Sequence, residues 1–409
     1  MSEGFSDLGA IAARLTQTPA LVLRRGALER NIARMQAACD GAGVRLRAHG
    51  KMHKCSPLGR LQVAAGAVGL CAQTVGEAEA FVRGGVDDVL VSAPVPSWGA
   101  ARLAALAAGG ARLAAVADDA EQIARLGAAA RAAGAELGVL VDVDLGQHRS
   151  GVAPGQALAL VRIAAGTPGL RWGGVQAYCG HLQHVVDLGA RRAAVDAATR
   201  RLAALVAELS AAELAPPVVS GGGTGTYALD LAGGVFTELQ AGSYAVMDAE
   251  YAGCDAPAAK GSGGGAWAFE PALVLATSVV SRRHATHATV DAGLKALSVD
   301  GPPARVVAGA APGSLWRPMG DEHGAIFPPG AEAWLREVGG DPLAFARAVD
   351  AANAEPPFAP GTVEPVAWLQ PGHCDPTVNL HDAFLVAGED GGLERWPIDA
   401  RRVTPEPRQ

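Results

Sequence analysis

The stretch RLAAVADDAEQIARLGAAARAA, residues 112–133, contains one strand and one helix of the fold that the sequence predicts. Its first five residues are mostly small and apolar and suit a buried strand, and the alanine-rich part from 119 to 133 suits a helix. The same unit recurs from about residue 20 to about residue 245. Short apolar strands that alternate with helices are typical of a parallel sheet whose two faces are both covered.

Repetition of this unit predicts a (β/α)8 barrel, an α/β fold of eight strand–helix units. The sequence contains nine candidate strands, so we expect the first of them to lie outside the barrel. Clear helical stretches are Ser97–Ala108, Asp119–Ala133 and Val185–Leu214. The candidate strands are Ala20–Leu23, Val44–Arg47, Val68–Ala72, Val89–Ser92, Arg112–Val116, Leu137–Val143, Gly173–Ala177, Val218–Ser220 and Thr237–Gln240.

A change of pattern after about residue 265 predicts a second, β-rich domain at the C-terminal end. Periodic helices become rare there, and strand-like segments are separated by loops rich in glycine and proline. An exception is the amphipathic helix Pro342–Asn353, which we expect within a surface insertion at 330–357. The strand-like segments are Ala272–Val279, Ala288–Val290 and Val363–Leu369.

The predicted boundary between the two domains follows residue 258, so the barrel covers 26–258 and the β-rich domain begins at 259. The glycine-rich segment Gly261–Gly265 suits a flexible link or a loop tip.

Composition excludes several classes of protein. The chain has 409 residues, a hydrophobic fraction of 49% and a net charge of −7 without a long basic run, which argues against disorder, nucleic-acid binding and anionic membranes. Charged residues interrupt every apolar stretch before it reaches transmembrane length, and the acidic N-terminus has no signal-peptide core. Six scattered cysteines without a framework spacing suit reduced thiols, so we expect a cytoplasmic protein.

Lysine is rare in this chain, which makes its positions informative. Two of the four lysines, Lys51 and Lys54, fall in the segment Arg47–Lys54, directly after the apolar residues 44–46. An amine can lose its proton and attack a carbonyl carbon, which a guanidinium group cannot do. A lysine at a strand end is therefore a candidate for Schiff-base chemistry, and the alternative is a solvated basic cluster.

Two turns of small residues, Ser220–Thr226 and Gln240–Tyr244, each follow a candidate strand. Backbone N–H groups of glycine-rich turns can converge on an anion. Barrels commonly bind phosphate with the loops after their seventh and eighth strands, which is where both turns fall. The sequence therefore predicts a phosphate site, and the alternative is a pair of ordinary tight turns.

Histidines and charged residues follow two further strands. The segment Tyr178–His184 contains His181 and His184, and histidine is the natural base near neutral pH. The other strand end carries Asp142, Asp144 and Arg149. We expect the two aspartates to bind loop backbone rather than a metal, and Arg149 to donate to a ring nitrogen or a carboxylate. His284, His287 and His323 receive no role unless the fold brings them together.

The segment Pro371–Thr377 contains His373 and Asp375, two residues apart. In an extended segment such side chains point to the same side and offer one nitrogen and one oxygen donor to a divalent ion. Cys374 would then point away, although a Cys–His pair could hold zinc if the segment bends. The alternative is a turn between prolines with an exposed histidine.

Together these segments resemble the fold-type III enzymes that use pyridoxal 5′-phosphate (PLP). Within that group the chain is similar to the D-threonine aldolase and D-serine dehydratase family, which joins an alanine-racemase-like barrel to a β domain. The resemblance extends from about Thr18 to about Arg401, and the insertion at 330–357 departs from it.

The resemblance implies a role for each site residue. Lys51 would form the Schiff base with PLP, Arg149 would contact the pyridine nitrogen, and the first strand would join the β-rich domain, which then comprises 1–25 and 259–409. His373 and Asp375 would bind a metal near the cofactor, with Mn²⁺ favoured over Mg²⁺ or Zn²⁺, and the protein would be a homodimer. The remaining cofactor-binding residues would be Tyr178, Ser220, Gly222, Gly223, Thr224, Gly242, Ser243 and Tyr244.

The implied activity is cleavage of a D-3-hydroxy amino acid into glycine and an aldehyde, with His184, ahead of His181, as the base. The spacing of His373 and Asp375 resembles that of the Mn²⁺-type aldolases, whereas His-x-Cys resembles that of the zinc dehydratases. A metal-dependent D-serine or D-3-hydroxy amino acid dehydratase and a D-3-hydroxyaspartate aldolase stay open as alternatives. An amino-acid racemase or a non-catalytic PLP carrier fits less well, because neither accounts for both the metal motif and the β-rich domain.

Overall fold

The computed structural model describes residues 5, 7–257, 267–357, 361–389 and 391–402. The chain divides into two compact units, which we call the barrel unit and the β unit. The barrel unit comprises Arg30–Ala245, Gly253–Ala268 and Pro397–Gln409, and the β unit comprises Met1–Glu29, Val246–Ala252 and Phe269–Trp396. The predicted link Gly261–Gly265 lies outside the described residues, and the predicted boundary at 258 stays a prediction.

The barrel unit is built on a parallel sheet in the order β2-β10-β9-β8-β7-β6-β5-β4-β3. Its two ends, β2 and β3, are consecutive pieces of one strand that is interrupted at Arg47. Because β2 pairs with β10 and β3 pairs with β4, the sheet closes on itself with eight strand positions, which confirms the predicted barrel. The strands are β2 Arg45–Leu46, β3 Ala48–His49, β4 Leu70–Ala72, β5 Asp88–Pro94, β6 Arg112–Ala117, β7 Leu137–Asp142, β8 Leu170–Ala177, β9 Val219–Gly221 and β10 Glu238–Leu239.

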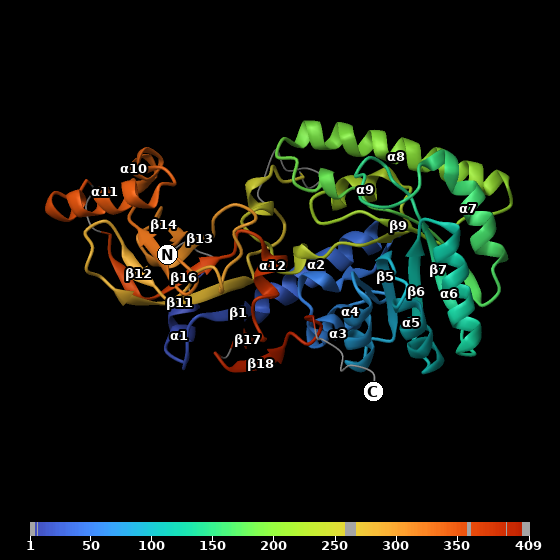
Figure 1. The fold of residues 1–409 in the computed structure, drawn as a ribbon, viewed down its shortest axis with the longest axis horizontal. Helices are drawn as coiled ribbons and strands as arrows, with labels where there is room; N and C mark the ends of the chain where they lie inside the picture. Colours follow the sequence, from blue (N-terminus) through green and yellow to red (C-terminus); the bar gives the residue numbers. More distant parts are fainter. Residues whose placement is uncertain (1–4, 6, 258–266, 358–360, 390, 403–409) are drawn as a thin grey trace. The chain divides into compact units, whose positions relative to one another are not determined.

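Helices cover the outside of this sheet, as Figure 1 shows for the helices around the parallel strands. In α6, Ile123, Leu126, Gly127 and Ala130 are buried, at the spacing that puts one helical face on the sheet, and Asp119 caps the helix by accepting from the N–H of Gln122. The helices are α2 Arg25–Gly41, α3 Ser56–Ala64, α4 Val75–Arg83, α5 Gly99–Ala108, α6 Ala120–Ala132, α7 Pro154–Gly166, α8 Leu188–Ala211 and α9 Tyr227–Gly233.

The β unit contains a mostly antiparallel sheet in the order β12-β15-β14-β13-β16-β11-β1-β17-β18. An additional pairing of β12 with β11 closes six of these strands into a second barrel. The first strand, β1, pairs antiparallel with β11 and parallel with β17, which confirms that it lies outside the parallel barrel. The strands are β1 Ala20–Arg24, β11 Leu273–Ser281, β12 Ala288–Val290, β13 Arg305–Ala310, β14 Leu315–Pro318, β15 Gly324–Phe327, β16 Val363–Gln370, β17 Ala383–Ala387 and β18 Leu393–Pro397.

The described residues of the β unit also form short or peripheral helices. The predicted helix at 342–353 is present as α11, with Asp341 as its cap, and α10 precedes it. Phe327 of β15 packs against Trp334 of α10 and Phe345 of α11, so an aromatic cluster anchors both helices to the sheet. The helices are α1 Leu8–Ala12, α10 Ala331–Val338, α11 Pro342–Ala354 and α12 Cys374–Val378.

Candidate active site

Lys51 lies immediately after β3, in the short 3-10 helix η1 Gly50–Met52. This is the carboxyl end of the first barrel strand, where barrels carry their functional groups. Its side chain is half-buried, and its backbone N–H donates to Nδ1 of His49 at 3.4 Å. The preceding residue has to be small, because a Cβ at Gly50 would come within 2.5 Å of the Phe81 ring.

His49 is buried beside Lys51 and is held by a hydrogen bond. Its Nε2 lies 3.0 Å from Oγ of Ser92, which in turn donates to the carbonyl of Ala72. Burial, and next to it the positive charge of Lys51, lowers the pKa of His49 well below its usual value of 6.5. His49 is therefore a neutral imidazole that donates from Nε2 and accepts at Nδ1.

Lys54, the second lysine of this segment, has a structural partner. Its Nζ forms an ion pair with the carboxylate of Glu77, whose side chain is only 2% exposed. Glu77 also accepts from the N–H of Gln73 at 2.6 Å. Lys54 therefore neutralises a buried carboxylate, and the two lysines of the segment differ in role.

The two turns of small residues lie side by side. Oγ1 of Thr224 accepts from the N–H of Tyr244 at 3.0 Å, and both residues are buried. Gly222 has φ +71°, a conformation that suits glycine. A Cβ at Gly242 would come within 3.0 Å of the carbonyl oxygen of His49, so the second turn also lies against the residues that precede Lys51.

Two predicted cofactor-binding side chains make hydrogen bonds within the barrel. Oγ of Ser220 donates to Glu238 at 2.8 Å and accepts from Gln240 at 2.8 Å. The hydroxyl of Tyr244 accepts from Gln62 at 3.1 Å, and burial raises its pKa above the usual range for tyrosine. These two side chains hold the turns in place.

The charged residues after β7 behave largely as predicted. Asp144 accepts from three successive N–H groups of its own loop, those of residues 146–148, at 2.8 to 3.1 Å. Asp142 accepts from the side chains of Gln176 and Ser150 rather than from loop backbone, so the prediction is wrong in that detail. Arg149 is exposed, and its guanidinium carbon lies 5.5 Å from the centre of the Tyr178 ring. The structure thus brings together these two predicted cofactor contacts.

The two candidate bases differ in exposure. His181 lies in the 3-10 helix η2 Gly180–Leu182 and is exposed, whereas His184 follows that helix and is half-buried. Both belong to the loop after β8, so they share the barrel unit with Lys51.

His373 and Asp375 lie at the start of α12 in the β unit. The prediction of an extended segment is wrong, because only His373 is extended (φ −129°, ψ 121°) and a helical turn begins at Cys374. Oγ1 of Thr377 donates to the carbonyl of His373 at 2.8 Å and stabilises this turn. Nε2 of His373 nevertheless lies 3.9 Å from Oδ2 of Asp375, so the two side chains face each other as the spacing predicted.

Further carboxylates surround His373 that the sequence pattern did not single out. Nδ1 of His373 lies 2.8 Å from Asp300 and 3.9 Å from Glu250. Burial lowers the pKa of His373, but the carboxylates, first Asp375 and then Asp300, outweigh it and raise the pKa above its usual value. In the described ranges no three His, Cys, Asp or Glu side chains form a ready metal-binding group.

Cys374 is fully buried, and its thiol donates to Oδ2 of Asp375 at 3.4 Å, so the expectation that it points away from the His373 and Asp375 pair is wrong. Its backbone N–H donates to Asp248 at 3.0 Å. Burial and then the carboxylates of Asp248 and Asp375 raise the pKa of its thiol well above the usual value.

Comparison with known proteins places this arrangement in a family. Residues 23–250 match the family model described as "Alanine racemase, N-terminal domain", and residues 272–387 match the one described as "Putative serine dehydratase domain". The chain belongs to the D-threonine aldolase and D-serine dehydratase family.

Three relatives illustrate the family. The chain is 40% identical to the 3-hydroxy-D-aspartate aldolase of Paracoccus denitrificans (strain Pd 1222), over 94% of this chain and 92% of the relative. It is 37% identical to the D-threonine aldolase of an Arthrobacter species, with the same coverage. The crystal structure of the D-threonine aldolase from Filomicrobium marinum superposes with a TM-score of 0.80 at 38% identity, over 94% of this chain and 96% of that one.

PLP is the cofactor expected for this family, and the residues of the barrel unit suit it. Lys51 supplies an amine at a strand end, Arg149 supplies a cation beside an aromatic ring, and the joined turns supply backbone N–H groups. In the β unit, His373 and Asp375 supply the nitrogen and oxygen donors that divalent transition metals accept. Both donor sets therefore fit the groups that the family implies.

Proposed function

We propose that this protein is a PLP- and divalent-metal-dependent aldolase that cleaves D-3-hydroxy amino acids into glycine and an aldehyde. The observation that carries the proposal is Lys51, a half-buried lysine at the carboxyl end of a barrel strand, in the same unit as two joined glycine turns. The relatives that the chain matches at 37% to 40% identity over 94% of its length include proteins named as aldolases.

Lys51 would hold PLP covalently through Nζ. The backbone groups of Gly222, Gly223, Thr224, Gly242 and Ser243 would bind its phosphate, with Ser220 and Tyr244 supporting the turns through their side chains. Arg149 would face the pyridine nitrogen, with Tyr178 beside it. When bound, PLP supplies an electron sink for the pair of electrons released at the α-carbon.

His373 and Asp375 would hold the metal, for which we propose Mn²⁺. A divalent metal supplies a Lewis acid that makes the β-hydroxyl of the substrate easier to deprotonate.

The proton transfers belong to residues of the chain. His184, ahead of His181, accepts the proton of the substrate's β-hydroxyl on a ring nitrogen. The oxygen's electron pair then forms the aldehyde C=O, the Cα–Cβ bond breaks, and its electron pair stays with Cα. Nζ of Lys51 or a water molecule then protonates Cα, which yields glycine.

We further propose a homodimer in the cytoplasm. All six cysteines are free thiols, which suits a reducing compartment. None of the described helices is both long enough and apolar enough to cross a membrane.

The cofactor assignment is tested by a matched pair of substitutions, Lys51→Arg and Lys54→Arg. Both keep the charge, but only the first removes the amine that we assign to the Schiff base. Lys51→Arg should abolish the imine absorbance band near the visible edge and the activity, and Lys54→Arg should keep both because a guanidinium can still pair with Glu77. An unchanged band in Lys51→Arg would remove Lys51 from the proposal.

The reaction is tested by its products. D-threonine incubated with the protein, PLP and Mn²⁺ should give acetaldehyde and glycine. Formation of 2-oxobutyrate and ammonia would identify a dehydratase instead. Because one relative is a 3-hydroxy-D-aspartate aldolase, D-3-hydroxyaspartate belongs in the substrate panel, and faster release of glyoxylate than of acetaldehyde would assign that substrate.

A further inference from the structure

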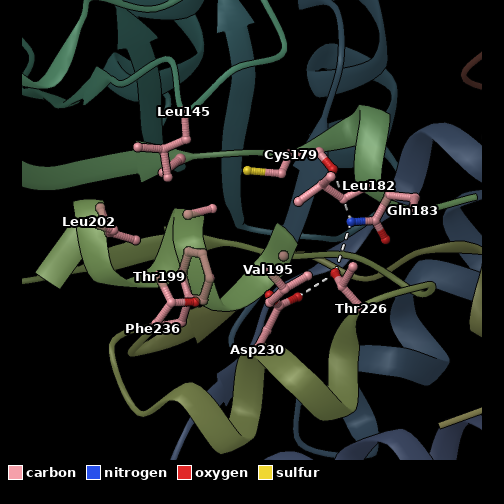
Figure 2. A pocket seen from close by; sticks show the side chains of 13 residues that line it. Leu145, Cys179, Leu182, Gln183, Val195, Thr199, Leu202, Thr226, Asp230 and Phe236 are labelled. Atoms are coloured by element: carbon pink, nitrogen blue, oxygen red, sulfur yellow. Dashed lines mark hydrogen bonds between the residues drawn. The ribbon is translucent and has the colours of Figure 1, made fainter. Parts of the chain in front are cut away.

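Gln183, the residue before His184, connects the histidine segment to the first glycine turn. Its side chain is buried, with an exposed fraction of 1%. Oε1 accepts from the N–H of Gly225 at 2.9 Å, and Nε2 donates to Oγ1 of Thr226 at 2.9 Å. Figure 2 shows the bond from Gln183 to Thr226 and its continuation to Asp230.

Asp230, on α9, lies directly against the same turn. Oγ1 of Thr226 donates to its Oδ2 at 2.5 Å, and the N–H of Gly223 is a second donor to this carboxylate. A Cβ at Gly222 would come within 2.6 Å of Oδ2, so the turn approaches the carboxylate as closely as glycine allows. Two donors of the proposed phosphate turn are therefore directed at an acidic side chain.

The side chain of Asp230 is buried, and its surroundings are mostly apolar. It lines a small cavity of about 10 Å³, room for about one water molecule, whose described lining residues include no basic side chain. Most of the lining is apolar and comes from β8 and the loop after it, from α8, and from Phe236. Burial therefore raises the pKa of Asp230 to about 7, against the hydrogen bonds from Thr226 and Gly223 that lower it.

Few charged groups face Asp230. Among the described lining residues the one other titratable side chain is Cys179, and its pKa is raised to about 12 by burial and then by Asp230 itself, so it stays protonated. Arg201 of α8 adds positive charge near Cys179 and donates to the carbonyl of Leu145 at 3.0 Å. Asp230 is thus the group of this cavity whose charge changes near neutral pH.

We propose that Asp230 is a positioning residue that sets the affinity of the turn for the cofactor phosphate, and that the turn binds phosphate best when Asp230 is neutral. The inference rests on the proposed function, because it takes this turn as the phosphate site. An ionised Asp230 holds the donors of Gly223 and Thr226 strongly and repels a phosphate dianion, whereas a protonated one accepts from these donors more weakly and carries no charge that repels phosphate. Phosphate binding is then accompanied by uptake of a proton.

The test compares PLP with pyridoxal, which lacks the phosphate. The apoprotein is titrated with each compound from about pH 6 to about pH 9, and the ratio of the two dissociation constants isolates the phosphate contribution, because imine formation at Lys51 is common to both. In the wild type the preference for PLP should fall about tenfold across this range. A change of about this size is expected when one negative charge, that of ionised Asp230, repels the phosphate. In Asp230→Asn the preference should change little with pH and exceed that of the wild type at high pH. Equal pH dependence in the two proteins would overturn the inference.

Two further variants serve as controls. Asp119→Asn makes the same change at a carboxylate that caps α6 and does not contact the turn, and it should behave as the wild type. Gln183→Glu places a carboxylate next to the N–H of Gly225 in the turn. Its negative charge should lower the preference for PLP at every pH. No effect of Gln183→Glu would count against electrostatic control of the turn.

A measurement on the wild type alone covers the case in which Asp230→Asn does not fold. Calorimetry in buffers of different ionisation enthalpy should show more proton uptake near pH 7 on binding PLP than on binding pyridoxal. Equal uptake would contradict the inference. If PLP and pyridoxal bind equally well at every pH, the turn is not the phosphate site and the cofactor assignment itself fails.

Discussion

Nδ1 of His373 lies 2.8 Å from Oδ2 of Asp300, a residue 73 positions earlier in the chain. This bond occupies Nδ1 and leaves Nε2 facing Asp375. Partial burial acts to raise the pKa of Asp300, but hydrogen bonds from Ser298 and His373 outweigh it and lower the pKa. An ionised carboxylate on the far nitrogen orients a metal-binding imidazole and increases its basicity.

Asp300→Asn should therefore weaken metal binding about 10- to 100-fold. The measurement is calorimetric titration of the chelator-treated protein with Mn²⁺, and the PLP absorbance should stay unchanged. Asp321→Asn is the matched control, because Asp321 is an exposed carboxylate of the same unit that pairs with Lys295. Equal Mn²⁺ affinity in all three proteins would mean that Asp300 does not position the metal ligand.

Thr224→Val should weaken PLP binding about tenfold, because it removes the acceptor for the buried N–H of Tyr244 and leaves that group unsatisfied at a cost of about 1–3 kcal/mol. Thr224→Ser keeps the oxygen and should restore most of the affinity. The readout is the dissociation constant for PLP, alongside a melting curve to check folding. Weakening by both variants alike would point to the methyl group rather than the hydrogen bond.

The parallel barrel could be predicted because its strands are short apolar runs between helices. The strands β13, β14, β15, β17 and β18 of the β unit were not predicted. β14 and β15 have four residues each, and β18, Leu393–Pro397, is mostly polar, whereas β13 and β17 are short apolar runs that were missed between loops. Placement of β1 needed the resemblance to the family, since its own four apolar residues suit either sheet.

The site residues that the sequence predicts all lie within short segments that carry their own pattern, such as Arg47–Lys54 at a strand end. The further residues that we propose depend on contacts between distant parts of the chain. Gln183 meets Thr226 across 43 positions, and Asp300 meets His373 across 73. The spacing of His373 and Asp375 also could not predict their local geometry. Thr377 stabilises a helical turn where the spacing suggested an extended segment.

Substitution of the two histidines after β8 should separate their roles. His184→Gln should lower kcat about 100-fold or more, the contribution of a general base, whereas His181→Gln, at the exposed position, should lower it less than tenfold. Each variant serves as the control for the other, and the PLP absorbance checks that the cofactor is bound. The reverse order of effects would assign the base to His181.

Acid should destabilise the β unit through His287. This side chain is 6% exposed, binds Thr286 and packs on Phe327 with ring centres 5.2 Å apart. Burial, and then the neighbouring His284, lowers its pKa from 6.5 to about 4. Between these two pKa values, His287 is protonated in the unfolded chain but neutral in the folded protein. The free energy of unfolding should therefore fall as the pH falls from about 6.5 to about 4, by up to about 3 kcal/mol.

His287→Phe should remove this part of the pH dependence, because a phenyl ring suits the aromatic cluster and does not titrate. The measurement is denaturant unfolding followed by the fluorescence of the tryptophans, which include Trp334 of that cluster, at several pH values. His323→Gln, at an exposed histidine of the same unit, should keep the wild-type slope. If the free energy of unfolding of His287→Phe changes with pH between 6.5 and 4 as it does in the wild type, the acid sensitivity does not arise from His287.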